Sequence, residues 1–128
     1  MPDLISEAKK ARENAVAPFS KYKVGAALVT KAGKVYRGCN VENCTYGLTV
    51  CAERVALLTA LAAGERDFTA IAVVTQSDEP GTPCGPYRQL MWEYCGDIDV
   101  TIANLTGKRI DYKLSTLFPH PFSFRLEE

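Results

Sequence analysis

The chain has 128 residues, in which 15 Lys and Arg side chains balance 15 Asp and Glu side chains, and 47% of the residues are hydrophobic. This is the composition of one ordinary globular domain over residues 1–128. It excludes a disordered tail, which needs low hydrophobicity and an excess of charge. Without surplus positive charge, a nucleic-acid partner held by general electrostatics is not expected.

The sequence contains no apolar run near the ~20 residues that span a bilayer. Residues 1–13 are mixed and charged, unlike a signal peptide. We therefore expect no membrane partner, a cytoplasmic location and reduced cysteines. An odd, irregularly spaced set of cysteines also fits no disulfide framework. The only histidine is His120, so any metal site must use thiolates or carboxylates. The cysteines are Cys39, Cys44, Cys51, Cys84 and Cys95.

Hydrophobic periodicity predicts a helix, two strands, a helix, a strand, a helix and two strands, followed by a tail after Leu114. The expected helices cover residues 3–15, 50–63 and 86–94. The expected strands cover residues 24–30, 35–40, 69–75, 99–104 and 109–113. In the second helix, Thr49 is a candidate cap, and one face is expected to carry Val55, Leu58 and Ala62. Strands that alternate with helices predict one sheet with helices on both faces.

In two segments, a cysteine stands where a loop enters a helix. They are Thr49-Val50-Cys51-Ala52-Glu53-Arg54 and Thr82-Pro83-Cys84-Gly85-Pro86-Tyr87-Arg88-Gln89. Unpaired N–H groups and the helix dipole stabilise a thiolate there, which favours metal binding or nucleophilic attack. Glu53 could act as a general acid and base beside Cys51. Because open α/β sheets bind ligands at the carboxyl ends of strands, the two helix starts could converge. A buried cysteine and a surface glutamate are the alternative interpretation.

A third segment, Gly38-Cys39-Asn40-Val41-Glu42-Asn43, leaves the second expected strand. The amide of Asn40 and the carboxylate of Glu42 can hold sugar hydroxyls by directed hydrogen bonds. Such residues are also common in ordinary loops, so this segment alone is a weak signal.

Together these segments resemble the zinc-dependent cytidine deaminases of the small homotetrameric kind. The resemblance covers nearly the whole chain. It includes Pro18-Phe19-Ser20-Lys21-Tyr22-Lys23-Val24-Gly25-Ala26-Ala27-Leu28, Asn40-Val41-Glu42-Asn43, Cys51-Ala52-Glu53-Arg54, Pro83-Cys84-Gly85, Arg88-Gln89 and Leu117-Phe118-Pro119. The resemblance implies a three-layer α-β-α sandwich with a five-stranded mixed sheet, a pyrimidine nucleoside as substrate, zinc as cofactor and a homotetramer.

The implied reaction is hydrolytic deamination of cytidine or 2′-deoxycytidine to the uridine form, with release of ammonia. In such enzymes, hydroxide on a thiolate-held zinc attacks C4 of cytosine. Cys51 and Cys84 match the first two ligand positions, and Glu53 matches the residue that shuttles protons. Arg54 matches an arginine that donates hydrogen bonds to the ligand thiolates.

The resemblance also implies the residues that contact substrate, which are Tyr22, Asn40, Glu42 and Ala52. Asn40 and Glu42 match the ribose-binding pair, and Tyr22 stands where the family usually has a Phe that lines the pocket. In the tail, Phe122 or Phe124 matches aromatic residues that enter a neighbouring subunit's pocket.

One position departs from the family motif Pro-Cys-Gly-x-Cys-Arg-Gln, in which the second cysteine is the third zinc ligand. This chain has Tyr87 there. A phenol reaches further from the backbone than a thiol and is a weaker acid, with a pKa of about 10 against 8.5. Cys95 lies three helical turns beyond Cys84, so it cannot easily replace the missing zinc ligand. Cys39 or Cys44 could replace it.

Four interpretations of Tyr87 follow. Zinc could bind through Cys51, Cys84 and the Tyr87 phenolate. Zinc could be lost, which would leave a protein that binds nucleosides without deaminating them. A cysteine could instead act as the nucleophile of a metal-free or altered hydrolase on a modified pyrimidine nucleoside. Tyr87 could also be an engineered or selected substitution. We expect the zinc-dependent deaminase, with the other three as alternatives.

Overall fold

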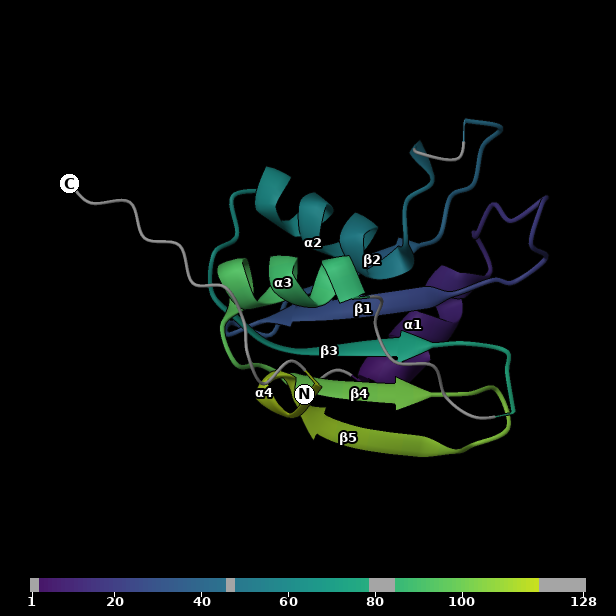
Figure 1. Ribbon diagram of the computed structural model, residues 1–128. Helices are drawn as coiled ribbons and strands as arrows, with labels where there is room; N and C mark the ends of the chain where they lie inside the picture. Colours follow the sequence, from purple (N-terminus) through teal and green to yellow (C-terminus); the bar gives the residue numbers. More distant parts are fainter. Residues whose placement is uncertain (1–2, 46–47, 79–84, 118–128) are drawn as a thin grey trace.

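The computed structural model describes residues 3–45, 48–78 and 85–117. Its helices and strands follow the predicted order, and only the short helix α4 was not predicted. Figure 1 shows α1 on one side of the sheet and α2 and α3 on the other. In these residues no helix is both long enough and apolar enough to cross a membrane. The elements are α1 (Leu4–Arg12), β1 (Gly25–Thr30), β2 (Val35–Cys39), α2 (Ala52–Ala62), β3 (Phe68–Val74), α3 (Gly85–Cys95), β4 (Asp99–Ala103), β5 (Arg109–Lys113) and α4 (Leu114–Leu117).

The strands form one mixed sheet in the order β2-β1-β3-β4-β5. Strand β1 is antiparallel to both β2 and β3, β3 and β4 are parallel, and β5 is antiparallel to β4. Since β2 and β3 both run opposite to β1, their carboxyl ends lie at the same edge of the sheet. Helices α2 and α3 follow these two strands in the chain, so both helices begin near that edge.

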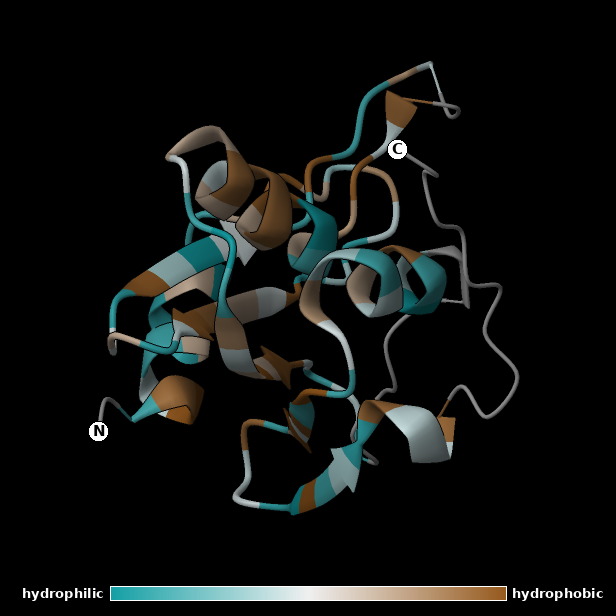
Figure 2. Cartoon of the chain, turned by 90° about the vertical axis from the view of Figure 1, so that its left-hand side faces the viewer, coloured by the Kyte–Doolittle hydropathy of each residue, from teal (hydrophilic) through white to brown (hydrophobic). Residues whose placement is uncertain are grey.

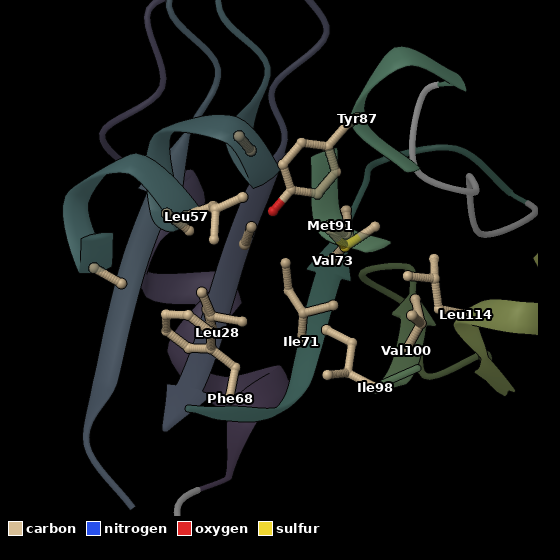
Figure 3. Packing of buried hydrophobic residues seen from close by; sticks show 14 of the residues in the cluster. Leu28, Leu57, Phe68, Ile71, Val73, Tyr87, Met91, Ile98, Val100 and Leu114 are labelled. Atoms are coloured by element: carbon tan, nitrogen blue, oxygen red, sulfur yellow. The ribbon is translucent and has the colours of Figure 1, made fainter. Parts of the chain in front are cut away.

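Alternating side chains of the strands form two cores, one on each face of the sheet. On the α2 and α3 face, Leu28, Ile71 and Val100 belong to a large cluster that also contains Tyr87 and Met91 (Figure 3). On the α1 face, the buried cluster is made almost entirely of alanine, with Ala8, Ala27, Ala72, Val74 and Ala103 as its buried members. The α1 face therefore holds a thinner core than the opposite face.

Helix α2 begins later than predicted, and it buries a different face. Its N-cap is Cys51 and not Thr49. Its buried residues are Ala52, Glu53, Ala56, Leu57 and Ala60, whereas Leu58 is exposed. The face with Val55, Leu58 and Ala62 is therefore not the buried one, because α2 meets β2 through small residues that carry little hydrophobic signal.

Gly38 sets how closely α2 approaches β2. A Cβ atom at Gly38 would lie 2.2 Å from the carbonyl oxygen of Ala52 and 2.4 Å from the amide nitrogen of Ala56. Both distances are well below van der Waals contact, so only glycine permits this approach. The first turn of α2 is thereby held directly against the strand that leads to Asn40.

Candidate active site

A cavity of about 700 Å³ lies beside the first turns of α2 and α3. Its volume is within the range of small-molecule sites in proteins. Figure 2 shows hydrophilic residues at the start of α2 and mostly apolar residues along the rest of that helix. Most residues that line the cavity are apolar, and Glu53 and Arg54 bring charged groups to it at the start of α2. It is lined by Val24, Asn40, Thr49, Val50, Cys51, Ala52, Glu53, Arg54, Leu58, Tyr87 and Leu90.

Cys51 and Glu53 place a thiol and a carboxyl group at the start of α2. Cys51 has the extended backbone of an N-cap residue, with φ −77° and ψ 157°, and its side chain is half-buried. Glu53 is only 4% exposed although it carries a carboxyl group. Unpaired N–H groups at a helix N-terminus favour negative charge on both side chains. The pair can thus bind a cation, or exchange protons with a ligand in the cavity.

Ala52 and Arg54 flank Glu53 on the same cavity wall. The side chain of Ala52 is fully buried, so Ala52 contributes a close-packed wall. Arg54 is exposed and brings a positive charge to the rim, beside Cys51 and Glu53. A cation in this place can offset negative charge at the helix start.

Tyr87 comes from the first turn of α3 and lines the cavity from the opposite side. It is 2% exposed and belongs to the large core cluster together with Met91. Figure 3 shows its ring between the two helices, with the hydroxyl oxygen directed toward α2. The aromatic ring therefore fills the space between α2 and α3 that borders the cavity.

The donor atoms of this wall can be compared with what zinc requires. Zinc binds thiolate sulfur, imidazole nitrogen and oxygen ligands. Cys51 offers a sulfur, Tyr87 directs an oxygen toward the same helix, and Cys84 directly precedes α3 but lies outside the described residues. Among residues 3–45, 48–78 and 85–117, no group of three or more His, Cys, Asp and Glu side chains could hold a metal. The described residues therefore supply one sulfur, from Cys51, and one oxygen, from Tyr87, and a zinc site would also need Cys84.

Asn40 lies at the end of β2 and lines the cavity, but its side chain also braces the backbone. Its Oδ1 accepts a hydrogen bond from the Val24 amide at 2.8 Å, and its Nδ2 donates to the Tyr22 carbonyl at 2.8 Å. One further hydrogen and one further lone pair of the amide stay available for a ligand. Tyr22 itself is not among the lining residues.

Glu42 faces a second, smaller cavity of about 300 Å³ that adjoins the first at Thr49. Its carboxylate accepts hydrogen bonds from the amides of Phe19 and Ser20, at 3.0 and 3.1 Å, and from the Ser20 hydroxyl. The hydrogen bonds from Ser20 hold the pKa of Glu42 below its ordinary value. Glu42 is thus ionised and close to the cavity of Cys51 and Glu53, without lining it.

Five lining residues were not singled out from the sequence as site residues: Val24, Thr49, Val50, Leu58 and Leu90. Four of them are aliphatic, and nothing in the sequence separates these four from ordinary core positions. Thr49 was considered only as a helix cap. The predicted site residues Cys84, Phe122 and Phe124 lie outside the described residues.

Comparison with known sequences decides the family. A sequence model for the zinc-binding region of cytidine and deoxycytidylate deaminases matches residues 2–102. The chain belongs to the cytidine and deoxycytidylate deaminase family. The zinc-binding region that defines this family is consistent with Zn²⁺ as the cofactor.

Individual cytidine deaminases are similar over almost the whole chain. The cytidine deaminase of Halalkalibacterium halodurans is 50% identical over 121 residues, which cover 94% of this chain and 92% of that protein. That of Sporosarcina psychrophila is 46% identical over 121 residues, which cover 94% and 89%. The crystal structure of cytidine deaminase from Burkholderia pseudomallei has a TM-score of 0.92 and 50% identity, and the match covers 95% of this chain and all of that one. The predicted fold, a mixed five-stranded sheet between helices, is confirmed.

Proposed function

We propose that this protein catalyses the hydrolytic deamination of cytidine and 2′-deoxycytidine to uridine and 2′-deoxyuridine, with release of ammonia. The observation that carries the proposal is Glu53, a buried carboxyl group beside Cys51 on the wall of a nucleoside-sized cavity. The similarity to cytidine deaminases that cover nearly the whole chain supports it.

Several of the predicted site residues have a part in this reaction. Cys51 and Cys84 would hold zinc, which when bound makes water nucleophilic at neutral pH. Glu53 takes the proton of the attacking water, delivers it to N3 of the base and then assists the departure of ammonia. Asn40 offers its remaining amide hydrogen to the ribose, and Glu42 can accept a sugar hydroxyl from the adjoining cavity. Arg54 offsets the negative charge of the thiolates.

Tyr87 takes the place of the third ligand cysteine in this proposal. Its hydroxyl, which points toward α2, would supply the third ligand in place of that cysteine. A phenol gives up its proton less readily than a thiol, so we expect weaker zinc binding than a site of three thiolates would have.

The direct test measures cytidine absorbance and zinc content with the purified protein. We expect cytidine to be consumed with stoichiometric release of ammonia, and about one zinc per chain by mass spectrometry. The Glu53→Gln variant, which keeps the side-chain shape but cannot carry protons, should lose at least about a hundredfold in kcat while it still binds cytidine. No loss of cytidine at high enzyme concentration, with only traces of zinc, would contradict the proposal.

A second candidate function is favoured by the burial of Tyr87. Its ring fills the space between the two helix starts, which suits a nucleoside-binding protein that has lost zinc. In that case uridine or cytidine would raise the melting temperature while no ammonia forms. The Tyr87→Cys variant separates the two functions, because a gain of zinc and of deamination in that variant alone would show that Tyr87 blocks the reaction.

Turnover of an N4-modified cytidine, abolished by Glu53→Gln, would instead indicate the altered hydrolase.

The assembly and location are part of the same proposal. We expect a homotetramer in the cytoplasm, in which tail residues Phe122 or Phe124 close the pocket of a neighbouring subunit. Sedimentation equilibrium should give four times the 14.0 kDa chain mass; a monomer mass would contradict the tetramer.

A further inference from the structure

The segment of residues 21–23, which precedes β1, is held by side chains from two distant elements. Gln76, at the exit of β3, donates from Nε2 to the Lys21 carbonyl at 3.2 Å and accepts at Oε1 from the Lys23 amide at 3.3 Å. Arg12, at the end of α1, donates from Nε to the Lys23 carbonyl at 3.0 Å and from its terminal nitrogen to Gln76 at 2.7 Å. The backbone on both sides of Tyr22 is thus fixed to β3 and α1.

Lys21 has a backbone conformation that a residue with a side chain does not favour. The hydrogen bonds to residues 21–23 therefore hold this segment against its local conformational preference. Lys21 has a φ of +60° and is the only non-glycine with positive φ among the described residues. The left-handed region is unfavourable for residues with a Cβ atom, and such a residue persists only where its surroundings hold it in place. The strained conformation therefore indicates that the position of the next residue, Tyr22, is tightly specified.

The side chain of Tyr22 adds a further connection to the exit of β3. Its hydroxyl forms a hydrogen bond of 2.9 Å with the hydroxyl of Ser77, which lies 3.2 Å from the hydroxyl of the buried Thr75. A phenylalanine at residue 22 could not form this bond. Tyr22 is therefore anchored at its aromatic end through Ser77.

The main chain of Tyr22 is hydrogen-bonded to Asn40, which lines the candidate active site. Its carbonyl accepts the hydrogen bond from Asn40 Nδ2, and the amide of Val24 donates to Asn40 Oδ1. Both Val24 and Asn40 line the large cavity. The orientation of the Asn40 amide, and with it the hydrogen that faces a ligand, depends on where residues 22–24 lie.

We propose that Ser77 is a positioning residue for nucleoside binding. Through the Tyr22 hydroxyl it fixes the carbonyl that orients Asn40, although neither Ser77 nor Tyr22 lines the cavity. This inference rests on the proposed function, because it assigns Asn40 a contact with the nucleoside. In this proposal Tyr22, which is not among the residues that line the cavity, acts on the substrate through Asn40.

The test compares uridine affinity by calorimetry, and KM and kcat for cytidine, in the wild type, Tyr22→Phe, Ser77→Ala and the double variant. Each single substitution should weaken uridine binding and raise KM by roughly threefold to tenfold, as expected for one hydrogen bond, while kcat changes less than about twofold. Because both substitutions break the same bond, the double variant should bind no more weakly than either single variant.

Tyr36→Phe is the matched control. The Tyr36 hydroxyl also forms a partly buried hydrogen bond, of 2.8 Å to Glu65, and interacts with Lys34, but it is not hydrogen-bonded to residues 21–24. This variant should lose comparable thermal stability and keep the wild-type uridine affinity. Wild-type affinity in Tyr22→Phe and Ser77→Ala, or effects that add in the double variant, would overturn the positioning role while the proposed function stands. A wild-type protein that neither binds uridine nor consumes cytidine would instead overturn the proposed function, and the positioning role with it.

Discussion

Among single residues, the cysteines differ in reactivity because their thiols are buried to different extents. Cys95, the last residue of α3, packs against the large core cluster, and burial raises the pKa of its thiol from 9.0 to about 12. Cys44 is exposed in the loop after β2. A buried thiol of this kind resists alkylation and stays protonated at the pH at which a free thiol ionises.

Cys95 should make the protein less stable in alkali. The unfolded chain releases the Cys95 proton near pH 9, whereas the native protein keeps it until about pH 12. Between these values the unfolded state binds fewer protons, so the free energy of unfolding falls as pH rises, by at most about 1.4 kcal/mol per pH unit. Urea denaturation of the wild type and Cys95→Ala from pH 8 to 10.5 measures this slope.

The Cys44→Ala variant is the control for that experiment, since its thiol is exposed in the native state. It should keep the wild-type slope, whereas Cys95→Ala should have a shallower one above pH 9. Equal slopes in all three proteins would show that Cys95 does not contribute to the alkaline loss of stability.

The residues of the site were predicted unevenly from the sequence. Cys51 and Glu53 could be singled out because a helix start gives a thiol and a carboxylate a definite electrostatic setting. The bracing role of Asn40 could not, because its partners are backbone groups of residues 22 and 24, and only the folded chain brings them together. The same holds for Ser77, whose partner Tyr22 is far away in the sequence.

At the scale of elements, the contact between α2 and β2 controls where the reactive groups lie. The helix starts at Ala52, whose carbonyl oxygen is the atom closest to the Cβ that a side chain at Gly38 would have. Hydrophobic periodicity predicted that α2 exists but not which face it buries, because the buried face is rich in alanine. A close approach through glycine and alanine leaves little trace in a hydrophobicity pattern.

Gly38→Ala should push the first turn of α2 away from β2. The added methyl group meets backbone atoms that cannot rotate away, so we expect a loss of about 1–3 kcal/mol in the free energy of unfolding. The displacement of Cys51 and Glu53 should also weaken nucleoside binding. Chemical denaturation and uridine calorimetry on the folded fraction measure both effects.

Gly33→Ala supplies the matched comparison in the turn between β1 and β2. A Cβ there meets no atom within 4 Å, but the φ of +92° is unfavourable for alanine. This variant should lose stability through strain alone and keep wild-type affinity. If Gly38→Ala likewise keeps full affinity, the position of α2 does not depend on Gly38.

At the scale of the whole molecule, the two faces of the sheet are covered to different extents. In the part of the chain that the structure describes, α1 packs mainly on β1, β2 and β3 and on β4 reaches Ala103, so the rest of β4 and β5 is less covered on that side (Figure 1). The side chains there are polar or charged, with ion pairs between Lys113 and Asp99 and between Arg109 and Asp111. Exposed ion pairs of this kind add little stability.

This layering predicts a gradient of amide protection across the sheet. Strands β1 and β3 are central, nearly all their residues are buried, and their amides should exchange most slowly. Strand β5 is at the edge with four of its five residues exposed, and should exchange much faster. Hydrogen-exchange mass spectrometry measures this order. Protection of β5 equal to that of β3 would show that another surface covers it.

The thin alanine core under α1 also affects how the sequence can change over time. A Cβ at Gly25 would lie 2.0 Å from the carbonyl oxygen of Ala8, so the helix already touches the strand. Larger side chains have no room in this layer, whereas the opposite core, with its leucine, isoleucine, methionine and tyrosine side chains, can exchange volume between neighbours. Adaptation to new nucleosides is therefore easier through substitutions on the α2 and α3 face, where altered packing also changes the shape of the cavity. The α1 face, in contrast, tolerates little change in side-chain size.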